Sequence, residues 1–365
     1  MGMPIDRLTI HGFKSIERLD EFPLGPINVL IGANGAGKSN FVSLFLMCQS
    51  VVRRAFQTYS EGLGDAIFFQ GPKTTPHISA RIRLGESVYS WELRAGQNGV
   101  VTVANEVVDN GKWRVSGAFT SRESNLFAIN HRSPEFANAA EAIATLRNAI
   151  DDWSVFHFLD TSPLSPMRRD QELRDDERFR EDASNIAAFL HRLGETAPAS
   201  PTLIRETVRL VAPFFDDFLL RPRQVGPAEK IRLEWRQKGS DFPFQPYQLS
   251  DGTLRFICLA TALLQPNPPS TIVIDEPELG LHPYALAVFA DLVKSAAERT
   301  QVILSTQSPA LVDFFQPEQV IVVNRREGRS EFERLDSTAL AEWLEDYTLG
   351  ELWRKNVVGG GPTDG

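Results

Sequence analysis

The sequence is poor in cysteine and contains no long hydrophobic run. Its two cysteines, Cys48 and Cys258, lie in apolar stretches typical of helices, so we expect two buried, reduced thiols and not a disulfide framework. This pattern indicates a cytoplasmic protein. No stretch approaches the roughly 20 apolar residues of a membrane helix, and the charged N-terminal residues do not resemble a signal peptide. We therefore expect a protein that is neither exported nor membrane-spanning.

The sequence also has fewer basic residues than acidic ones. Lys and Arg total 38 against 47 for Asp and Glu, a formal net charge of −9, so the field of the whole molecule does not favour a polyanion such as DNA. Contact with DNA would need a local basic patch. The candidate is a group of arginines in a mixed-charge segment: Arg168, Arg169, Arg174, Arg178 and Arg180. Acidic neighbours largely cancel these charges, so the sequence leaves open a DNA-binding patch but favours a solvated face of salt bridges.

The hydrophobic pattern predicts buried strands with helices between them. Continuous apolar runs are typical of parallel strands buried on both faces, and they occur at 27–32, 271–276 and 301–306. Helical periodicity predicts helices at 38–54, 137–150, 184–193, 201–212, 253–265 and 283–297. Alternation of apolar and polar residues predicts an antiparallel β arm at 78–84, 89–94, 100–108 and 112–116, and a further strand is expected near 230–236.

The strongest motif follows the first buried strand. Residues 32–39 read GANGAGKS and fit the P-loop pattern G-x-x-x-x-G-K-[ST], with a predicted helix directly after them. Glycines let such a loop point backbone N–H groups at phosphate, and the helix N-terminus adds the positive end of its dipole. Lys38 then reaches the β- and γ-phosphates, and Ser39 ligates Mg²⁺. The residues predicted to contact ATP in this motif are Asn34, Gly35, Ala36, Gly37, Lys38, Ser39 and Asn40.

Two carboxylates end the second buried strand. Asp275 and Glu276 stand at the carboxyl edge of the predicted parallel sheet, beside the P-loop. Because side chains alternate along a strand, the two have different surroundings and different tasks. Asp275 is predicted to hold Mg²⁺ through water, and Glu276 to orient and deprotonate the attacking water. The combination predicts Mg²⁺-dependent ATP hydrolysis, with a stand-alone phosphotransferase as an alternative.

A third motif, LSDGTLR at residues 249–255, resembles the signature of ABC-type ATPases. With Ser250 as N-cap, the following helix leaves backbone N–H groups free for an anion, although the P-loop already occupies a different helix end. The resemblance implies that Ser250 and Gly252 face the γ-phosphate of ATP held by a second copy of the chain. The motor ATPase of a transporter is an alternative, but LSDGT departs from the LSGGQ that is common there.

Other residues near these motifs carry weaker signals. Gln307 in STQSP stands where many relatives have His; it can bond a γ-phosphate or the attacking water but cannot titrate near neutral pH. Gln70 is a candidate Mg²⁺ ligand or a plain loop residue. Lys14 in GFKSI stands where relatives touch the nucleotide. His282 is interpreted as a structural residue at a helix start.

Together, FKSI, INVLIGANGAGKSN, LSDGTLRF, IDEPELGLHP and STQSP resemble the RecF-like predicted ATPases of the AAA-15/AAA-21 group, relatives of overcoming-lysogenization-defect (OLD) and chromosome-maintenance ATPases. The resemblance implies one α/β P-loop domain of the ABC-ATPase head type, with a mostly parallel core sheet, an antiparallel β arm and a helical lobe. We assign 1–120 to the first part of the nucleotide-binding lobe, 121–265 to the helical lobe with the signature, and 266–365 to the second part of the nucleotide-binding lobe.

The resemblance also implies a function and partners. We expect a bacterial ATPase, with ATP and Mg²⁺ as cofactors, whose homodimer closes around ATP and serves as a nucleotide switch in DNA repair or anti-phage defence. Its output is expected from a separately encoded nuclease or Toprim-like effector. Aromatic and apolar residues near the C-terminus either pack on the sheet or dock such an effector: Trp343, Leu344, Tyr347, Leu349, Leu352 and Trp353.

Overall fold

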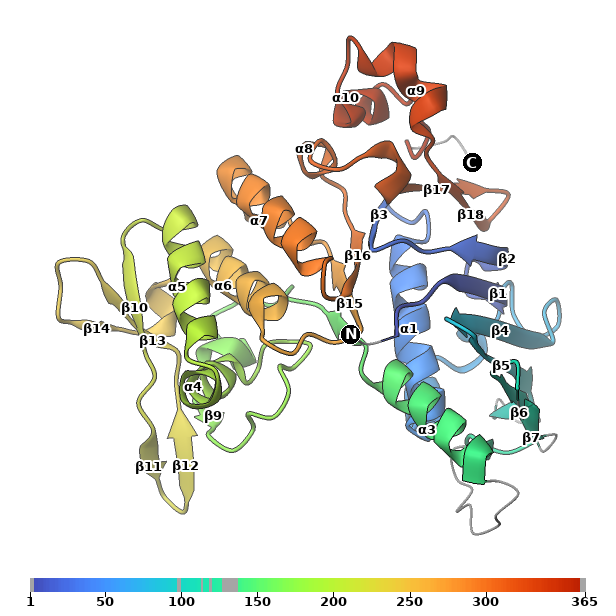
Figure 1. The fold of residues 1–365 in the computed structure, drawn as a ribbon, viewed down its shortest axis with the longest axis horizontal. Coiled ribbons are helices and arrows are strands. Elements are labelled where there is room, and N and C mark those ends of the chain that lie inside the picture. Colours follow the sequence, from blue (N-terminus) through green and yellow to red (C-terminus); the bar gives the residue numbers. More distant parts are fainter. Residues whose placement is uncertain (1–2, 97–99, 113, 118–119, 127–136, 362–365) are drawn as a thin grey trace.

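The computed structural model describes residues 3–96, 100–112, 114–117, 120–126 and 137–361. At its centre is a six-stranded sheet in the order β18-β17-β3-β16-β15-β8 (Figure 1). Its strands are β3 (Ile27–Ile31), β8 (Ser154–Phe156), β15 (Thr271–Asp275), β16 (Gln301–Ser305), β17 (Val320–Arg326) and β18 (Arg329–Arg334). Every neighbouring pair is parallel except β17 and β18, which confirms the mostly parallel core sheet.

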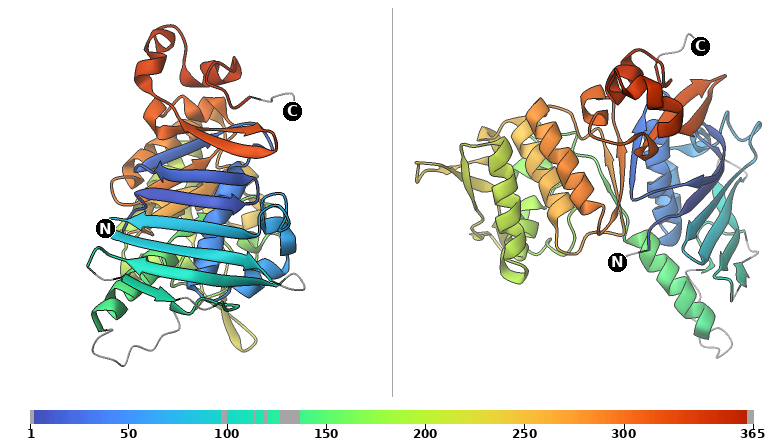
Figure 2. Two further views of the ribbon diagram at one scale, coloured as in Figure 1. Left: turned by 90° about the vertical axis from the view of Figure 1, so that its right-hand side faces the viewer. Right: turned by 45° about the horizontal axis from the view of Figure 1, so that its top comes forward.

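A second, antiparallel sheet forms the β arm and is seen face-on in Figure 2 (left). Its order is β2-β1-β4-β5-β6-β7. The strands are β1 (Arg7–Phe13), β2 (Ile16–Pro23), β4 (His77–Leu84), β5 (Ser87–Ala95), β6 (Val101–Asp109) and β7 (Arg114–Gly117). Burial alternates along β4, as the sequence pattern predicted. Residue 113 of the predicted strand 112–116 lies outside the described residues.

Helix α1 (Lys38–Val52) lies between the two sheets (Figure 1). Its residues Phe41 and Phe45 share one hydrophobic core with Leu30 of β3 and with the β arm. Val29 of β3 points the other way, into a second core built with α6 (Asp251–Leu264) and α7 (Pro283–Ala296). Because successive strand residues face opposite sides, the continuous apolar run of β3 serves both cores. Helices α1 and α6 therefore cover opposite faces of the core sheet.

The helical lobe contains α4 (Ile186–Thr196), α5 (Ala199–Val211), the 3₁₀ helix η6 (Pro246–Gln248) and two small antiparallel sheets. Their strands are β9 (Gln171–Glu172), β10 (Phe215–Leu219), β11 (Arg223–Val225), β12 (Ala228–Ile231), β13 (Glu234–Gln237) and β14 (Pro243–Phe244). The single strand predicted near 230–236 is therefore wrong, because β12 and β13 pair in different sheets. The chain changes sheets at Arg232, whose guanidinium makes two 2.9 Å hydrogen bonds to Asp170.

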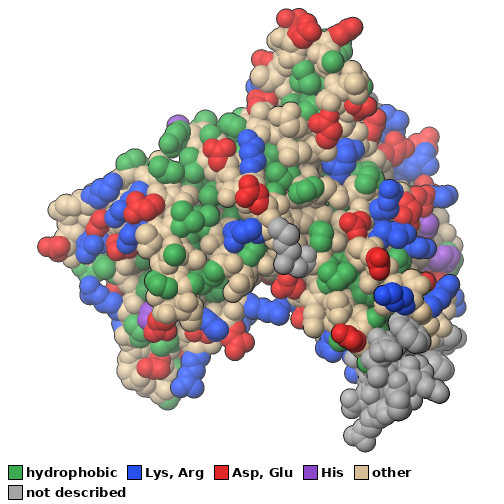
Figure 3. All heavy atoms as spheres, viewed as in Figure 1, with side chains coloured by type: hydrophobic (Ala, Val, Ile, Leu, Met, Phe, Trp, Pro, Cys, Tyr) green, Lys and Arg blue, Asp and Glu red, His purple; other side chains and the backbone are tan. Residues whose placement is uncertain are grey.

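Two exposed arginines of the arginine-rich segment, Arg178 and Arg180, form salt bridges with acidic residues. Arg180 lies 2.6 Å from Asp175, and Arg178 lies 3.8 Å from Asp151. Basic and acidic side chains are interspersed over the part of the surface seen in Figure 3, without a large patch of one sign. Arg168 differs from the others because its side chain is buried.

The remaining helices are α2 (Phe56–Glu61), η1 (Gly64–Ile67), α3 (Ala137–Asp151), η5 (Pro166–Arg168), α8 (Pro309–Val312), η7 (Pro317–Gln319), α9 (Ser337–Leu344) and α10 (Leu349–Arg354). Helix α3 and strand β8 fall within the segment that we assigned to the helical lobe. Nevertheless, β8 pairs with β15 in the core sheet, and α3 contacts α1. The predicted boundary at residue 121 therefore precedes two elements that pack with the nucleotide-binding lobe.

The C-terminal aromatic residues differ in their surroundings. Leu352 and Trp353 are buried, and the indole of Trp353 donates a 3.2 Å hydrogen bond to the carbonyl of Gly360. Trp353 belongs to the core on the α6 side of the central sheet. Trp343, by contrast, is 47% exposed. Packing on the sheet thus accounts for the α10 residues, and docking of a partner stays a prediction for Trp343.

Cys48 and Cys258 are both buried free thiols, as the sequence predicted. Desolvation raises the pKa of Cys48 and of Cys258, which keeps both protonated. None of the helices in the described parts of the chain combines the length and the apolar character needed to cross a bilayer.

A buried carboxylate in the β arm accepts several hydrogen bonds. Glu106 of β6 accepts hydrogen bonds from the Tyr89 hydroxyl (2.9 Å), the Ser124 hydroxyl (2.6 Å) and the backbone N–H groups of Asn125 and Leu126. Glu106→Ala would leave these buried donors without their acceptor, so we expect the free energy of unfolding to fall by about 3 kcal/mol. Urea unfolding measures this, with the exposed Glu86→Ala as control. Equal stability of the two variants would contradict the prediction.

Candidate functional site

The P-loop joins the carboxyl end of β3 to the amino end of α1. Gly35 and Gly37 have φ angles of 78° and 117°, in the left-handed region that glycine tolerates best. A Cβ at Gly37 would lie 2.0 Å from the Ser330 hydroxyl oxygen, so a larger residue would clash there. Gly37 is also the N-cap of α1 and brings no side chain to its N–H groups. These groups are therefore free to bind an anion.

The predicted P-loop residues differ in exposure. Asn34, Gly35 and Ser39 are exposed, Asn40 is half-buried, and Ala36, Gly37 and Lys38 are buried. The Lys38 ammonium donates to the loop's own carbonyls, at 2.6 Å to Gly32 and 3.2 Å to Ala33. Its burial lowers its pKa, an effect that the nearby carboxylates of Asp275, Glu276 and Glu278 oppose. The loop lysine and the acidic end of β15 thus share one electrostatic environment.

The acidic edge is built by two neighbouring parallel strands. Asp275 of β15 lies opposite Ser305 of β16, and the N–H of Glu276 donates a 2.8 Å hydrogen bond to the carbonyl of Ser305. Asp275 is buried, and its Oδ1 atom has no hydrogen-bond partner within the described structure. A buried carboxylate oxygen with free acceptor capacity suits Mg²⁺ and its water ligands. Ser39 and Asp275 are the residues that would hold this ion.

Glu276 has an unusual backbone conformation. Its φ angle is 48°, in a region that side chains longer than Asn seldom occupy. The Gln307 side-chain amide donates to the Glu276 carboxylate, and the Gln307 N–H donates a 2.7 Å hydrogen bond to Glu278. Burial raises the pKa of Glu278. Strained residues held by their surroundings are frequent at active sites, so this geometry marks Glu276 as a candidate catalytic residue.

His157 is a site residue that sequence reasoning missed. It follows the three-residue strand β8, and its Nδ1 atom lies 3.9 Å from Oδ2 of Asp275. A short strand with no motif gives no signal in the sequence. The pairing of β8 with β15 is what brings His157 to the acidic edge.

Lys14 and Gln70 face a separate hollow. It is lined by Lys14, Asn40, Gln70, Arg325 and other residues, and Asp275 is not among them. The Lys14 ammonium donates a 2.8 Å hydrogen bond to Ser43 of α1, and burial lowers its pKa. Arg325 of β17, also missed, donates a 2.8 Å hydrogen bond to the carbonyl of Gly35. A nucleotide role for Lys14 and a metal role for Gln70 stay predictions.

The signature segment forms the start of α6. Ser250 is the N-cap and accepts a 3.2 Å hydrogen bond from the N–H of Thr253. Gly252 packs so closely on the loop after Glu276 that an added Cβ would lie 2.2 Å from the Gly280 carbonyl oxygen. Buried Arg255 holds the same loop by donating to the Leu279 carbonyl. His282 caps α7 by accepting a 3.2 Å hydrogen bond from Tyr284, which confirms its structural position.

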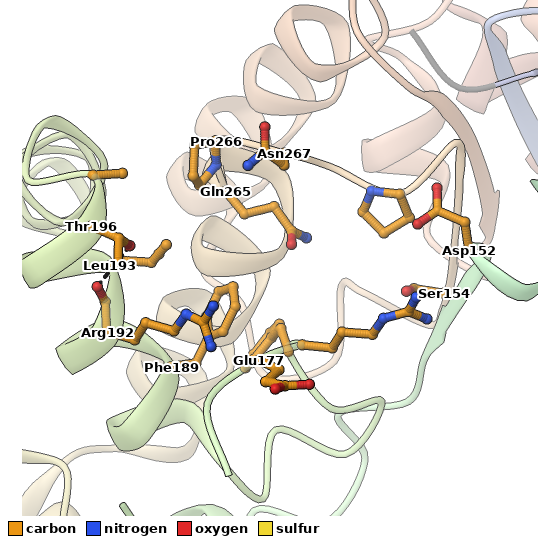
Figure 4. A pocket seen from close by; sticks show the side chains of 14 residues that line it. Asp152, Ser154, Glu177, Phe189, Arg192, Leu193, Thr196, Gln265, Pro266 and Asn267 are labelled. Atoms are coloured by element: carbon orange, nitrogen blue, oxygen red, sulfur yellow. Dashed lines mark hydrogen bonds between the residues drawn. The ribbon is translucent and has the colours of Figure 1, made fainter. Parts of the chain in front are cut away.

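Another pocket, of about 370 Å³, lies near the amino ends of β8 and β15 (Figure 4). Arg192 and Phe189 come from α4, and Gln265 and Asn267 come from the end of α6 and the segment after it. None of the predicted site residues lines this pocket. The candidate site is therefore at the opposite, carboxyl edge of the core sheet, as expected for parallel sheets.

A comparison with protein families agrees with these motifs. The family described as "AAA domain, putative AbiEii toxin, Type IV TA system" matches residues 27–100 and 115–313, more than half of the chain. The chain belongs to this family. The match includes the P-loop, the signature segment and the acidic edge, and it confirms the resemblance to the AAA-21 group.

Two curated relatives extend the comparison. OLD nuclease of Thermus scotoductus is 24% identical over 376 residues, which cover 95% of this chain and 67% of the relative. DNA double-strand break repair Rad50 ATPase of Saccharolobus solfataricus is 36% identical over 69 residues, 19% of this chain and 7% of the relative. The chain thus spans about two thirds of the first relative and a small part of the second.

Solved structures share the fold. The Smc head bound to the C-winged helix domain of ScpA has a TM-score of 0.59 at 17% identity, with 93% of this chain and 99% of that chain covered. The Smc head with an extended coiled coil, bound to the C-terminal domain of ScpA from Pyrococcus furiosus, has a TM-score of 0.55 at 15% identity. The match covers 94% of this chain and 99% of that chain. The ABC-type head fold is therefore confirmed. The chain thus combines the sequence features of the AAA family with the fold of an Smc head, and it is similar to OLD nuclease and, over 69 residues, to Rad50 ATPase.

Proposed function

We propose that the protein hydrolyses ATP with Mg²⁺ at sites shared between two copies of the chain. The observation that carries this proposal is the acidic edge, where the carboxylates of Asp275 and the strained Glu276 lie within the electrostatic reach of Lys38 and the Gln307 amide donates to Glu276. Lys38 and the N–H groups of α1 bind the phosphates, and Ser39 and Asp275 hold Mg²⁺, which supplies charge neutralisation of the phosphates. Glu276 accepts the proton of the attacking water, and Gln307 orients Glu276.

The shared site is supported by the positions of the two helix ends. The P-loop precedes α1 on one face of the core sheet, whereas the signature begins α6 on the other face. Large apolar side chains are exposed on segments around the signature and the acidic edge: Leu164, Tyr247, Leu279 and Tyr284. Exposed apolar groups of this kind are typical of surfaces that a partner covers. A second copy of the chain would cover these apolar side chains, and the P-loop of that copy would face Ser250 and Gly252 of the first.

Mixing two inactive variants tests the shared site. Lys38→Ala removes a phosphate-binding group but keeps the signature, and Ser250→Arg blocks the signature but keeps the P-loop. Each variant alone is expected to be inactive. A heterodimer contains one intact composite site, so turnover should recover to about half of the wild-type value if the two sites act independently. Absence of recovered turnover in verified heterodimers would show that each chain hydrolyses ATP alone.

We further propose that the ATP-bound dimer is a cytoplasmic switch for a separate activity on nucleic acid, in DNA repair or anti-phage defence. The relatives' names, OLD nuclease and DNA double-strand break repair Rad50 ATPase, support this class of output. A nuclease or Toprim-like effector is the partner that we expect, with Trp343 as a contact candidate. Affinity purification from native cells tests this, with wild type and Trp343→Ala each compared with and without ATP. A partner whose binding is changed neither by ATP nor by Trp343→Ala would contradict the proposal.

A further inference from the structure

Arg168 is a buried charge that none of the motifs accounts for. Its side chain is only 4% exposed, although the next residue, Arg169, is exposed. The guanidinium is nevertheless well supplied with acceptors. Nε donates a 2.8 Å hydrogen bond to the carbonyl of Thr161, and Nη2 donates a 2.6 Å hydrogen bond to the carboxylate of Asp251. Nη1 donates to the carbonyls of Pro246 and, at 3.2 Å, Leu249.

These acceptors bracket the signature serine. Leu249 and Asp251 are the residues directly before and after Ser250, and Pro246 begins η6, which leads into them. Arg168 therefore fixes the chain on both sides of Ser250 and leaves the exposed Ser250 itself untouched. A planar guanidinium can hold several acceptors in one fixed geometry, whereas a flexible ammonium cannot.

The hydrogen bonds of Arg168 are better suited to orienting the signature segment than to stabilising the fold. Burying a charge is costly unless it is paired and hydrogen-bonded, and an apolar side chain of similar volume often stabilises a protein equally well. The carboxylate of Asp251 is 65% exposed, so the ion pair alone is a weak source of stability. What an apolar residue could not supply is the simultaneous hold on Pro246, Leu249 and Asp251.

We propose that Arg168 is a positioning residue that sets the orientation in which the signature segment presents Ser250 to ATP bound by a second copy of the chain. This inference rests on the shared site proposed above. None of the acceptors of Arg168 belongs to the P-loop or to β15. Arg168 therefore acts on the partner's nucleotide through Ser250 and leaves ATP binding by its own P-loop unchanged.

Arg168→Lys separates orientation from charge. The variant keeps a cation near Asp251 but cannot bond the carbonyls on both sides of Ser250. We expect turnover to fall about tenfold, while the affinity of the monomer for ATP stays within about twofold of wild type. Arg169→Lys is the matched control, because Arg169 is the exposed neighbour, and it should leave both quantities unchanged. Wild-type turnover in Arg168→Lys, or an equal loss in the control, would overturn the proposal.

Heterodimers identify the site at which Arg168 acts. Arg168→Lys mixed with Lys38→Ala should recover one working site, formed by the P-loop of the first variant and the signature of the second. In the heterodimer of wild type with the double variant Lys38→Ala/Arg168→Lys, turnover per intact site should stay near that of Arg168→Lys. The one intact P-loop, on the wild-type chain, faces the altered signature of the double variant. The reverse pattern would place Arg168 at its own nucleotide and overturn the proposal.

Two further arms keep the outcome interpretable. If Arg168→Lys lowers the melting temperature, Asp251→Asn tests the same hold at an exposed residue and should reduce turnover about twofold to threefold with unchanged ATP affinity. Unchanged turnover in Asp251→Asn together with an unfolded Arg168→Lys would assign Arg168 to stability alone. Failure of the Arg168→Lys mixture while the Ser250→Arg mixture recovers overturns only this inference, whereas failure of both overturns the shared site as well.

Discussion

Glutamine in place of Glu276 is expected to reduce the rate of ATP hydrolysis by about 100-fold or more while ATP binding is kept. The substitution preserves the size of the side chain and a partner for Gln307, but it removes the group that accepts a proton from the attacking water. Because the nucleotide is then not consumed, the ATP-bound state should accumulate. With ATP and Mg²⁺, light scattering should therefore detect stable dimers of Glu276→Gln.

Two control variants sharpen this experiment. Lys38→Ala lacks the phosphate-binding ammonium and should remain monomeric under the same conditions. Glu298→Gln changes an exposed glutamate beyond the end of α7 and should keep wild-type turnover. Persistent monomers of Glu276→Gln at saturating ATP would contradict a dimer that closes on the nucleotide, and near-normal turnover would assign the proton acceptor to another residue.

Alanine at Gly252 is expected to reduce turnover about 30-fold and to lower the free energy of unfolding by about 1–3 kcal/mol, the usual range for overpacking. The added Cβ would lie 2.2 Å from the carbonyl oxygen of Gly280, and a backbone atom cannot move aside as a flexible side chain can. The start of α6 and the loop after Glu276 must then separate. Both the signature and the acidic edge would change their orientation, while the P-loop should still bind ATP.

Gly194→Ala is the matched control for Gly252→Ala. Gly194 also lies in a helix, α4, but an added Cβ there meets nothing within 4 Å. Alanine should therefore raise the stability by up to about 1 kcal/mol through its helix propensity and leave turnover unchanged. Wild-type turnover in Gly252→Ala would contradict a functional need for the close approach of the two segments.

The parts of the site that follow strand ends could be predicted from the sequence. The P-loop and the pair Asp275 and Glu276 each come directly after a continuous apolar run, and parallel strands bring such positions to one edge. The structure has these elements at the predicted positions. Ser250 as helix cap was also predictable, because capping depends on local residue types.

The remaining parts depend on contacts between distant segments. His157 follows a strand of three residues, too short for a periodic pattern, and Arg325 lies on a strand that the sequence did not indicate. The local sequence around Arg168 is rich in charge and gives no sign that this side chain is buried. At the break between β12 and β13, Arg232 bonds to Asp170, which is remote in sequence.

The position of α1 between two sheets has a mechanical consequence. A helix that is packed into a hydrophobic core between two sheets resists displacement, because close-packed interiors cannot deform gradually. The P-loop is therefore joined to a closely packed helix. We expect nucleotide-dependent movement to appear as a rotation of the α4–α6 side against this fixed frame, so that hydrogen exchange should slow around Ser250 on ATP binding and change little along α1.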